Sequence, residues 1–239
     1  MVNSNAVMTK GDGELFLFWL VPVFGVTWVA AFLAFPGFMP PMSPALSADQ
    51  VAAFYRDPDN LARIRGSMIV FNWFGVGLIP FLALVVMQIR RMAHRTPILA
   101  YCYLGCITGG PMLFFLADLF WLLAAYRPER AASEIQLFND IAWITFTGQV
   151  GFLIGQCVFL ALAIFLDRQQ QPVFPRWVAQ FNLLIAAALA PASFVALAQT
   201  GPIAWDGALS FWLKNAAIVC WIVVMTVMIG RNLYAQRRA

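Results

Sequence analysis

Two aspartates lie inside stretches of otherwise apolar residues. Asp118 is in FFLADLFWLL (114–123), and Asp140 is in NDIAW (139–143). An ionised carboxylate in the hydrocarbon of a bilayer is costly unless it is paired or hydrated, so such residues usually face the interior of a helical bundle. A desolvated carboxyl group there can serve as a proton donor. Asp118 and Asp140 are therefore the candidate catalytic residues if the chain is an enzyme.

Further polar residues are expected at the same depth as these aspartates. At 1.5 Å per residue from the predicted outer helix ends, Asp118 and Lys214 lie about 10 Å deep, Asn72 about 9 Å and Asp140 about 6 Å. Because these residues belong to four different predicted helices, we expect one shared polar layer. Asp118 should then have a polar partner on another helix, with Lys214 the first candidate and Asn72 the second. Alternatively, Lys214 extends its ammonium toward the outer headgroups.

Tryptophan follows each of the two aspartates by one helical turn, at Trp121 and Trp143. Each indole N–H could donate to a carboxylate, or the rings could belong to the aromatic belt at the membrane interface. The candidate ligand-binding residues are Asn72, Asp118, Trp121, Asn139, Asp140, Trp143 and Lys214.

The composition indicates that these residues are positioned by transmembrane helices. Hydrophobic residues make up 62% of the 239 and charged residues 11%, whereas about a quarter of the residues in soluble domains are charged. A helix needs roughly 20 apolar residues to cross a bilayer. The sequence predicts an all-α membrane bundle of six helices in a single domain, with spans at about 15–35, 67–88, 98–125, 136–166, 177–198 and 208–230. The polar start before residue 15 and the missing cleavage pattern predict that the first span is retained.

The distribution of basic residues predicts that both termini lie inside. With that orientation the inner flanks hold more Lys and Arg than the outer loops, as cytoplasmic flanks usually do. QIRRMAHR (88–95) contains no acid, whereas the outer arginines alternate with Asp and Glu. We therefore expect the inner surface to face anionic lipid headgroups.

The connection 36–65 is too long for a simple turn between helices. Its first part is rich in proline, and SADQ (47–50) has the capping-box spacing, with Ser47 as N-cap and Gln50 three residues later. A short helix over about 48–56 is predicted, with Val51 and Phe54 packed against the bundle and DPD (57–59) ending it. This outer helix either seals the bundle or forms a lid over a cavity.

Other chemistry has little support in the sequence. His94 is the only histidine and lies in an inner loop, and the four cysteines all fall within predicted helices without a CxxC. P-loop, GxSxG and HExxH motifs are absent. We predict no metal site, no cofactor and no nucleic-acid partner.

Several segments carry a family resemblance. PPMSPALSADQVAAFYRDP, LADLFWLLAAYRPER, NDIAW, PVFPRWVAQFN and TGPIAWDG resemble those of uncharacterised multi-pass membrane proteins of actinobacteria and other bacteria. The resemblance covers roughly residues 36–225. It implies a bacterial inner membrane and six helices, and it implies no activity.

Three functions fit these features. The first is a protein that binds or carries an amphipathic or lipophilic small molecule in a polar pocket toward the outer leaflet. The second is an intramembrane acid/base enzyme, such as an isomerase or cyclase. The third is an accessory subunit whose polar residues meet a membrane-protein partner or a second copy. Membrane lipids are expected partners in each case.

Overall fold

The structure, a computed structural model, describes residues 12–238, which form helices and no strands. The elements are α1 (Asp12–Ala34), α2 (Ala48–Arg56), α3 (Pro58–Phe74), η1 (Gly75–Gly77), α4 (Leu78–Arg90), α5 (Ile98–Tyr126), α6 (Ala132–Gly148), α7 (Gly151–Phe165), α8 (Arg176–Leu189), η2 (Ala190–Leu197), η3 (Ala208–Leu213) and α9 (Lys214–Arg238). Six segments are long and apolar enough to cross a membrane: Gly13–Ala34, Pro58–Arg90, Ile98–Tyr126, Ala132–Phe165, Arg176–Leu197 and Ala208–Arg237. The all-α bundle of six spans is confirmed, and the chain is a multi-pass membrane protein.

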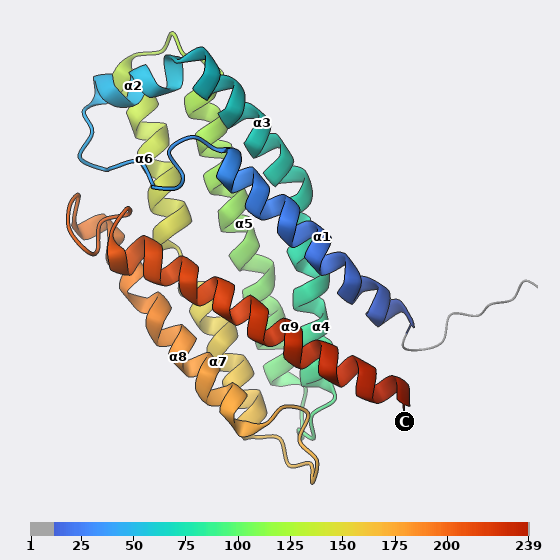
Figure 1. Ribbon diagram of the computed structural model, residues 1–239. Coiled ribbons are helices and arrows are strands. Elements are labelled where there is room, and N and C mark those ends of the chain that lie inside the picture. Colours follow the sequence, from blue (N-terminus) through green and yellow to red (C-terminus); the bar gives the residue numbers. More distant parts are fainter. Residues whose placement is uncertain (1–11, 239) are drawn as a thin grey trace, which may run out of the picture.

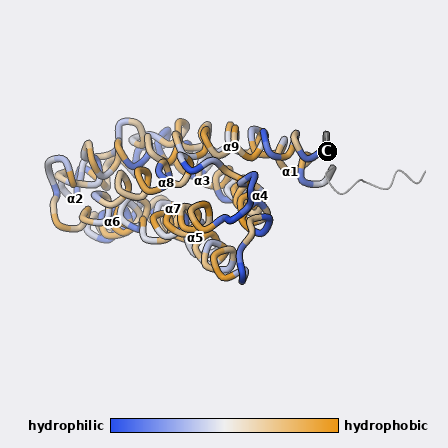
Figure 2. The backbone as a smooth tube through the Cα atoms, turned by 90° about the horizontal axis from the view of Figure 1, so that it is seen from below, coloured by the Kyte–Doolittle hydropathy of each residue, from blue (hydrophilic) through white to orange (hydrophobic). Residues whose placement is uncertain are grey.

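The helices pack into a bundle with α1 and α9 along one face. Figure 1 shows these two helices running side by side in front of the others. In the view from below they lie along one edge, opposite α5 and α7, and hydrophobic stretches recur along all the long helices (Figure 2). The short helix α2 lies at one end of the bundle, called the α2 end here, and the 91–97 loop lies at the opposite end (Figure 1).

The short helix predicted over 48–56 is present as α2. The Ser47 side chain accepts from Gln50 N at 3.4 Å, and the Gln50 side chain accepts from Ser47 N at 2.9 Å, which completes the capping box. Val51 is 2% exposed and packs into the bundle, whereas Phe54 is half-buried. Tyr55, which is fully buried, contributes more to this contact than Phe54 does.

The second span begins earlier than predicted. The sequence predicts an outer loop that extends to residue 65, but α3 begins at Pro58. Asp57 accepts from Asn60 N at 2.9 Å as the N-cap, and Pro58 occupies the first helical turn. DPD therefore ends α2 and also starts α3, because Pro lacks only an N–H that has no partner at a helix start.

The segment between α1 and α2 folds into the bundle. Phe35, Phe38 and Met42 are at most 8% exposed. The chain turns at Gly37, whose φ of 72° favours glycine. Trp205 Nε1 donates to the Met42 carbonyl at 2.7 Å. The proline-rich segment is therefore a packed plug at the α2 end.

Four of the six spans depart from regular α-helix. A 3-10 segment, η1, separates α3 from α4, and another, η2, follows α8. A π-helical turn, η3, precedes α9. Between α6 and α7, Val150 N donates to Gly148 O at 2.9 Å, and not to Phe146 O as a continuous α-helix would require. The Phe146 carbonyl is thereby freed for another donor.

Arginine side chains at the α2 end donate mainly to carbonyl groups at the C-terminal ends of helices. Arg63 donates to Ala34 O at 3.1 Å, and Arg65 donates to Ala125 O at 2.8 Å. These carbonyls end α1 and α5, where cations are favourable. Four of the five arginines predicted in the outer loops therefore donate to main-chain carbonyls: Arg56, Arg63, Arg65 and Arg130.

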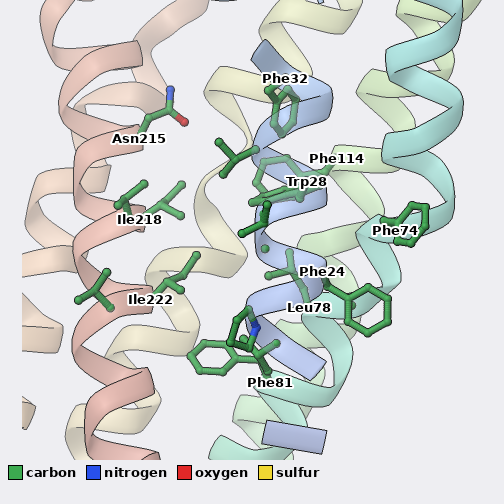
Figure 3. A pocket seen from close by; sticks show the side chains of 18 of the residues that line it. Phe24, Trp28, Phe32, Phe74, Leu78, Phe81, Phe114, Asn215, Ile218 and Ile222 are labelled. Atoms are coloured by element: carbon green, nitrogen blue, oxygen red, sulfur yellow. The ribbon is translucent and has the colours of Figure 1, made fainter. Parts of the chain in front are cut away.

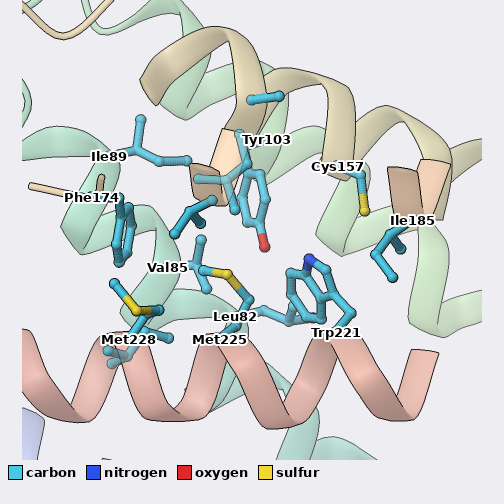
Figure 4. Close-up of a cluster of buried hydrophobic side chains, with 14 of the residues drawn as sticks. Leu82, Val85, Ile89, Tyr103, Cys157, Phe174, Ile185, Trp221, Met225 and Met228 are labelled. Carbon is cyan, nitrogen blue, oxygen red and sulfur yellow. The ribbon is translucent and has the colours of Figure 1, made fainter. Parts of the chain in front are cut away.

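At the end of the bundle away from α2, a hydrophobic core joins α4, α5, α7, α8 and α9 (Figure 4). Tyr103 is fully buried and points its hydroxyl toward Trp221, whose Nε1 donates to Asn182 Oδ1 at 2.8 Å. This core fixes the positions of α7 and α9, which carry cavity residues described below.

Candidate functional site

Asp118 lies between α5 and α3 and is 1% exposed. Asn72 Nδ2 donates to its Oδ2 at 3.5 Å, while Oδ1 has no hydrogen-bond partner in the part of the chain that the structure describes. The predicted polar partner on another helix is confirmed, and it is the second candidate, Asn72. The first candidate is wrong, because Lys214 has a different partner.

Lys214 is fully buried where α6 is interrupted. Its Nζ donates to the Phe146 carbonyl at 2.9 Å and lies 4.1 Å from the centroid of the Phe146 ring. This is the carbonyl freed by the break before α7. Among the described residues Lys214 has no ion pair with Asp118 or Asp140, and its ammonium does not extend to the headgroups. The Nζ donor thereby satisfies a main-chain carbonyl in the last turn of α6, inside the membrane.

Asn139 and Asp140 form a separate polar group under α2. The Tyr55 hydroxyl donates to Asn139 Oδ1 at 3.0 Å, and Asn139 Nδ2 donates to Asp140 Oδ1 at 3.4 Å. Burial, and secondarily the Asp140 carboxylate, raise the pKa of Tyr55 well above its usual value. The phenol therefore stays protonated and serves as the donor that holds α2 on α6.

Trp121 and Trp143 belong to an aromatic cluster and not to an interfacial belt. Both rings are fully buried, 5.1 Å apart between centroids, and neither Nε1 has a hydrogen-bond partner among the described residues. Phe38 from the plug packs on Trp143 at 5.8 Å. The cluster includes Phe32, Phe35, Phe38, Trp121, Trp143, Phe146, Trp205 and Phe211. Indole-to-carboxylate bonds, one of the two alternatives from the sequence, are absent among the described residues.

The polar residues therefore do not form one shared site. Asn72 and Asp118 lie on one flank, Asn139 and Asp140 lie under α2, and Lys214 lies at the helix break. Depth along each helix predicted which polar residues lie inside the membrane. Their side chains point in different directions around the helix axes, so they do not meet.

A cavity of about 450 Å³ lies between α1 and α9 (Figure 3). Trp28 and Phe32 of α1 face Ile218 and Ile222 of α9 across it, and Asn215 lies near one end. The two helices meet nearer the opposite end, where Trp19 Nε1 donates to the Tyr234 hydroxyl at 3.1 Å.

The cavity opens sideways toward the lipid. Lining residues on both rims have exposed side chains, among them Val26 at 72% and Val219 at 59%. Close packing of α1 on η1 forms its floor, since a Cβ on Gly77 would lie 2.1 Å from Phe24 Cγ. The volume is in the range of small-molecule sites.

A second space of about 50 Å³, called the branch here, lies beside the cavity toward α7. Trp28, Phe81 and Ile222 line both spaces, and Gln156 and Cys157 lie on the wall of the branch. None of the seven residues predicted to bind ligand lines either space, and their role in binding stays a prediction. The sequence carries no charged signal for these spaces, because apart from Gln156, Asn215 and Thr226 their walls are ordinary apolar membrane-helix residues.

No family model matches the chain, and neither a curated protein nor a solved structure matches it. The functional argument therefore depends on the geometry of the cavity and of the polar groups.

Proposed function

We propose that the protein binds or carries a lipophilic small molecule in the cavity between α1 and α9. The observation that carries this proposal is the 450 Å³ space with apolar walls and a lateral opening. A ligand dissolved in the bilayer could enter between the exposed rims without crossing water. The bacterial inner membrane, with both termini inside and the α2 end outside, is part of the proposal.

The position of the site differs from the polar pocket expected from the sequence. Lys214 is separated from the cavity by the Phe146 ring, which lines the space and also contacts Nζ. Among the described residues that line the cavity none is acidic or basic. An acid/base enzyme acting in this cavity would need such a group, so binding is the better-supported function.

Saturable photolabelling tests the proposal. The probe is a hexadecyl chain with a terminal diazirine, added to the protein in nanodiscs with or without excess unlabelled hexadecyl chain. We expect competition to reduce labelling of peptides from α1 and α9, while labelling of the outer helix surfaces stays unsaturable.

Two glycines give a matched pair of variants for this assay. A Cβ on Gly25 or Gly105 would meet nothing within 4 Å, but only Gly25 lines the cavity. Gly25→Leu should fill the space and abolish the saturable labelling, and Gly105→Leu should leave it unchanged. Equal labelling in both variants would contradict the proposal.

One observation favours a second function, that of a subunit in a membrane complex. Asn72 is exposed on α3 beside the buried Asp118, and Trp73 is 72% exposed. A polar side chain facing lipid is unfavourable, and the hydrogen-bonding capacity that Asn72 keeps beyond its bond to Asp118 would be satisfied by a partner helix. Trp73→Cys tests this function, because a disulfide-linked dimer or a cross-linked partner should form in native membranes.

A further inference from the structure

Gln156 differs from the other buried amide side chains in its hydrogen bonding. It lies on α7, is 6% exposed, and lines the branch. It makes no hydrogen bond with any described residue, although buried polar groups nearly always have a partner.

Two other amide side chains near the cavity have hydrogen-bond partners, as buried amides usually do. Asn182 accepts from Trp221 Nε1 at 2.8 Å and donates to Val178 O at 2.8 Å. Asn215, at the other end of the cavity, donates to Phe211 O at 2.9 Å. Gln156 therefore uses none of its donor and acceptor capacity on the described residues, and its side chain lines the branch.

The polar groups that line the cavity are all uncharged. Besides Gln156 they are the Asn215 amide, the Thr226 hydroxyl, the weakly polar Cys157 thiol and the Trp28 indole, whose Nε1 is sealed from the space. An anionic headgroup would be left there without a cation, which is costly in a medium of low dielectric constant. A hydroxyl or carbonyl group would suit a single amide.

We infer that the ligand is an uncharged lipid whose hydroxyl or carbonyl oxygen bonds to the Gln156 carboxamide. Its hydrocarbon chain fills the main cavity, and the end of the chain projects into the lipid between α1 and α9. The inference rests on the proposed function and adds the class of ligand and its direction in the site.

Three probes with one carbon skeleton test the inference: farnesol, farnesene and farnesyl diphosphate. Each is used to displace the diazirine probe from the wild-type protein in nanodiscs. We expect farnesol to bind about tenfold more tightly than farnesene, the difference made by one hydrogen bond between uncharged groups. Farnesyl diphosphate should bind least tightly.

Gln156→Leu should lower the affinity for farnesol to that for farnesene and leave farnesene unchanged. Gln180→Leu is the matched control, because Gln180 is exposed on α8 and lines neither space. It should leave both affinities as in the wild type.

The outcomes separate the inference from the proposed function. If farnesol and farnesene displace the probe equally well, the Gln156 contact is refuted while binding in the cavity stands. Tightest binding of the diphosphate refutes the uncharged headgroup. If no probe competes in a saturable way, the proposed function itself fails. The wild-type comparison decides the inference even if Gln156→Leu does not fold.

Discussion

Gly148→Ala should destabilise the bundle where α6 is interrupted. A Cβ on Gly148 would lie 2.5 Å from Val195 Cγ1 of η2, whereas carbon atoms in contact are normally about 3.5–4.0 Å apart. Val195 is 3% exposed, and its branched side chain has little rotational freedom. The overlap of about 1 Å must therefore be relieved by moving η2 or α6.

The magnitude follows from two opposing contributions. Replacing glycine by alanine in an open helix stabilises by about 0.5–1 kcal/mol. Forcing an extra methyl group into a packed core costs about 1–3 kcal/mol. We expect Gly148→Ala to lower the free energy of unfolding by about 0.5–2 kcal/mol, whereas Gly105→Ala, with nothing within 4 Å of its Cβ, should raise it.

A double-mutant cycle provides the decisive measurement. Val195→Ala removes the atom that Gly148→Ala would meet, so the two substitutions together should cost at least about 1 kcal/mol less than the sum of each alone. Unfolding is measured by denaturant titration in mixed micelles, followed by circular dichroism. If the two effects add to within about 0.5 kcal/mol, the close contact between α6 and η2 is refuted.

Three further predictions concern other parts of the chain. Asp118→Asn should keep the thermal unfolding midpoint or raise it, because an amide oxygen can still accept from Asn72; a fall of more than about 4 °C, equivalent to roughly 1 kcal/mol, would show that the carboxylate itself stabilises the fold. Cysteine at position 45 should react with a membrane-impermeant reagent in whole cells and cysteine at position 93 should not, since Ala45 and Ala93 are exposed at opposite ends; the reverse pattern would invert the orientation. The raised pKa of Tyr55 contributes stability that is complete below its unfolded-state pKa of about 10 and is lost as pH rises above it; hydrogen exchange in α2 should therefore speed up above that pH in the wild type, and a Tyr55→Phe variant with the same pH dependence would contradict this.

Local rules predicted local structure well. The Ser47 and Gln50 spacing located α2 to the residue, because a capping box depends only on neighbouring backbone. The start of α3 was missed since Asp57 and Pro58 were interpreted only as a stop signal. Hydropathy located the spans, because each must match the thickness of the bilayer.

Partners between helices were less predictable. Depth placed Asp118 and Asn72 at one level, and they do form a hydrogen bond. The partner of Lys214 is a main-chain carbonyl that is free only because the helix breaks after Phe146. A free main-chain carbonyl is not indicated by any residue type in the sequence. A search for carboxylate partners could therefore not have found the Phe146 carbonyl.

The interruptions in the spans have a mechanical consequence. α5 runs the length of the bundle as 29 residues of continuous helix, whereas a 3-10 turn separates α3 from α4. Membrane helices adapt to a thinner bilayer by tilting or bending, and 3-10 segments are points where bending is easy. We expect α5 to stay straight and rigid, while the span formed by α3 and α4 bends at η1. Because Gly77 and Phe74 also line the cavity, bilayer thickness should set the width of the cavity.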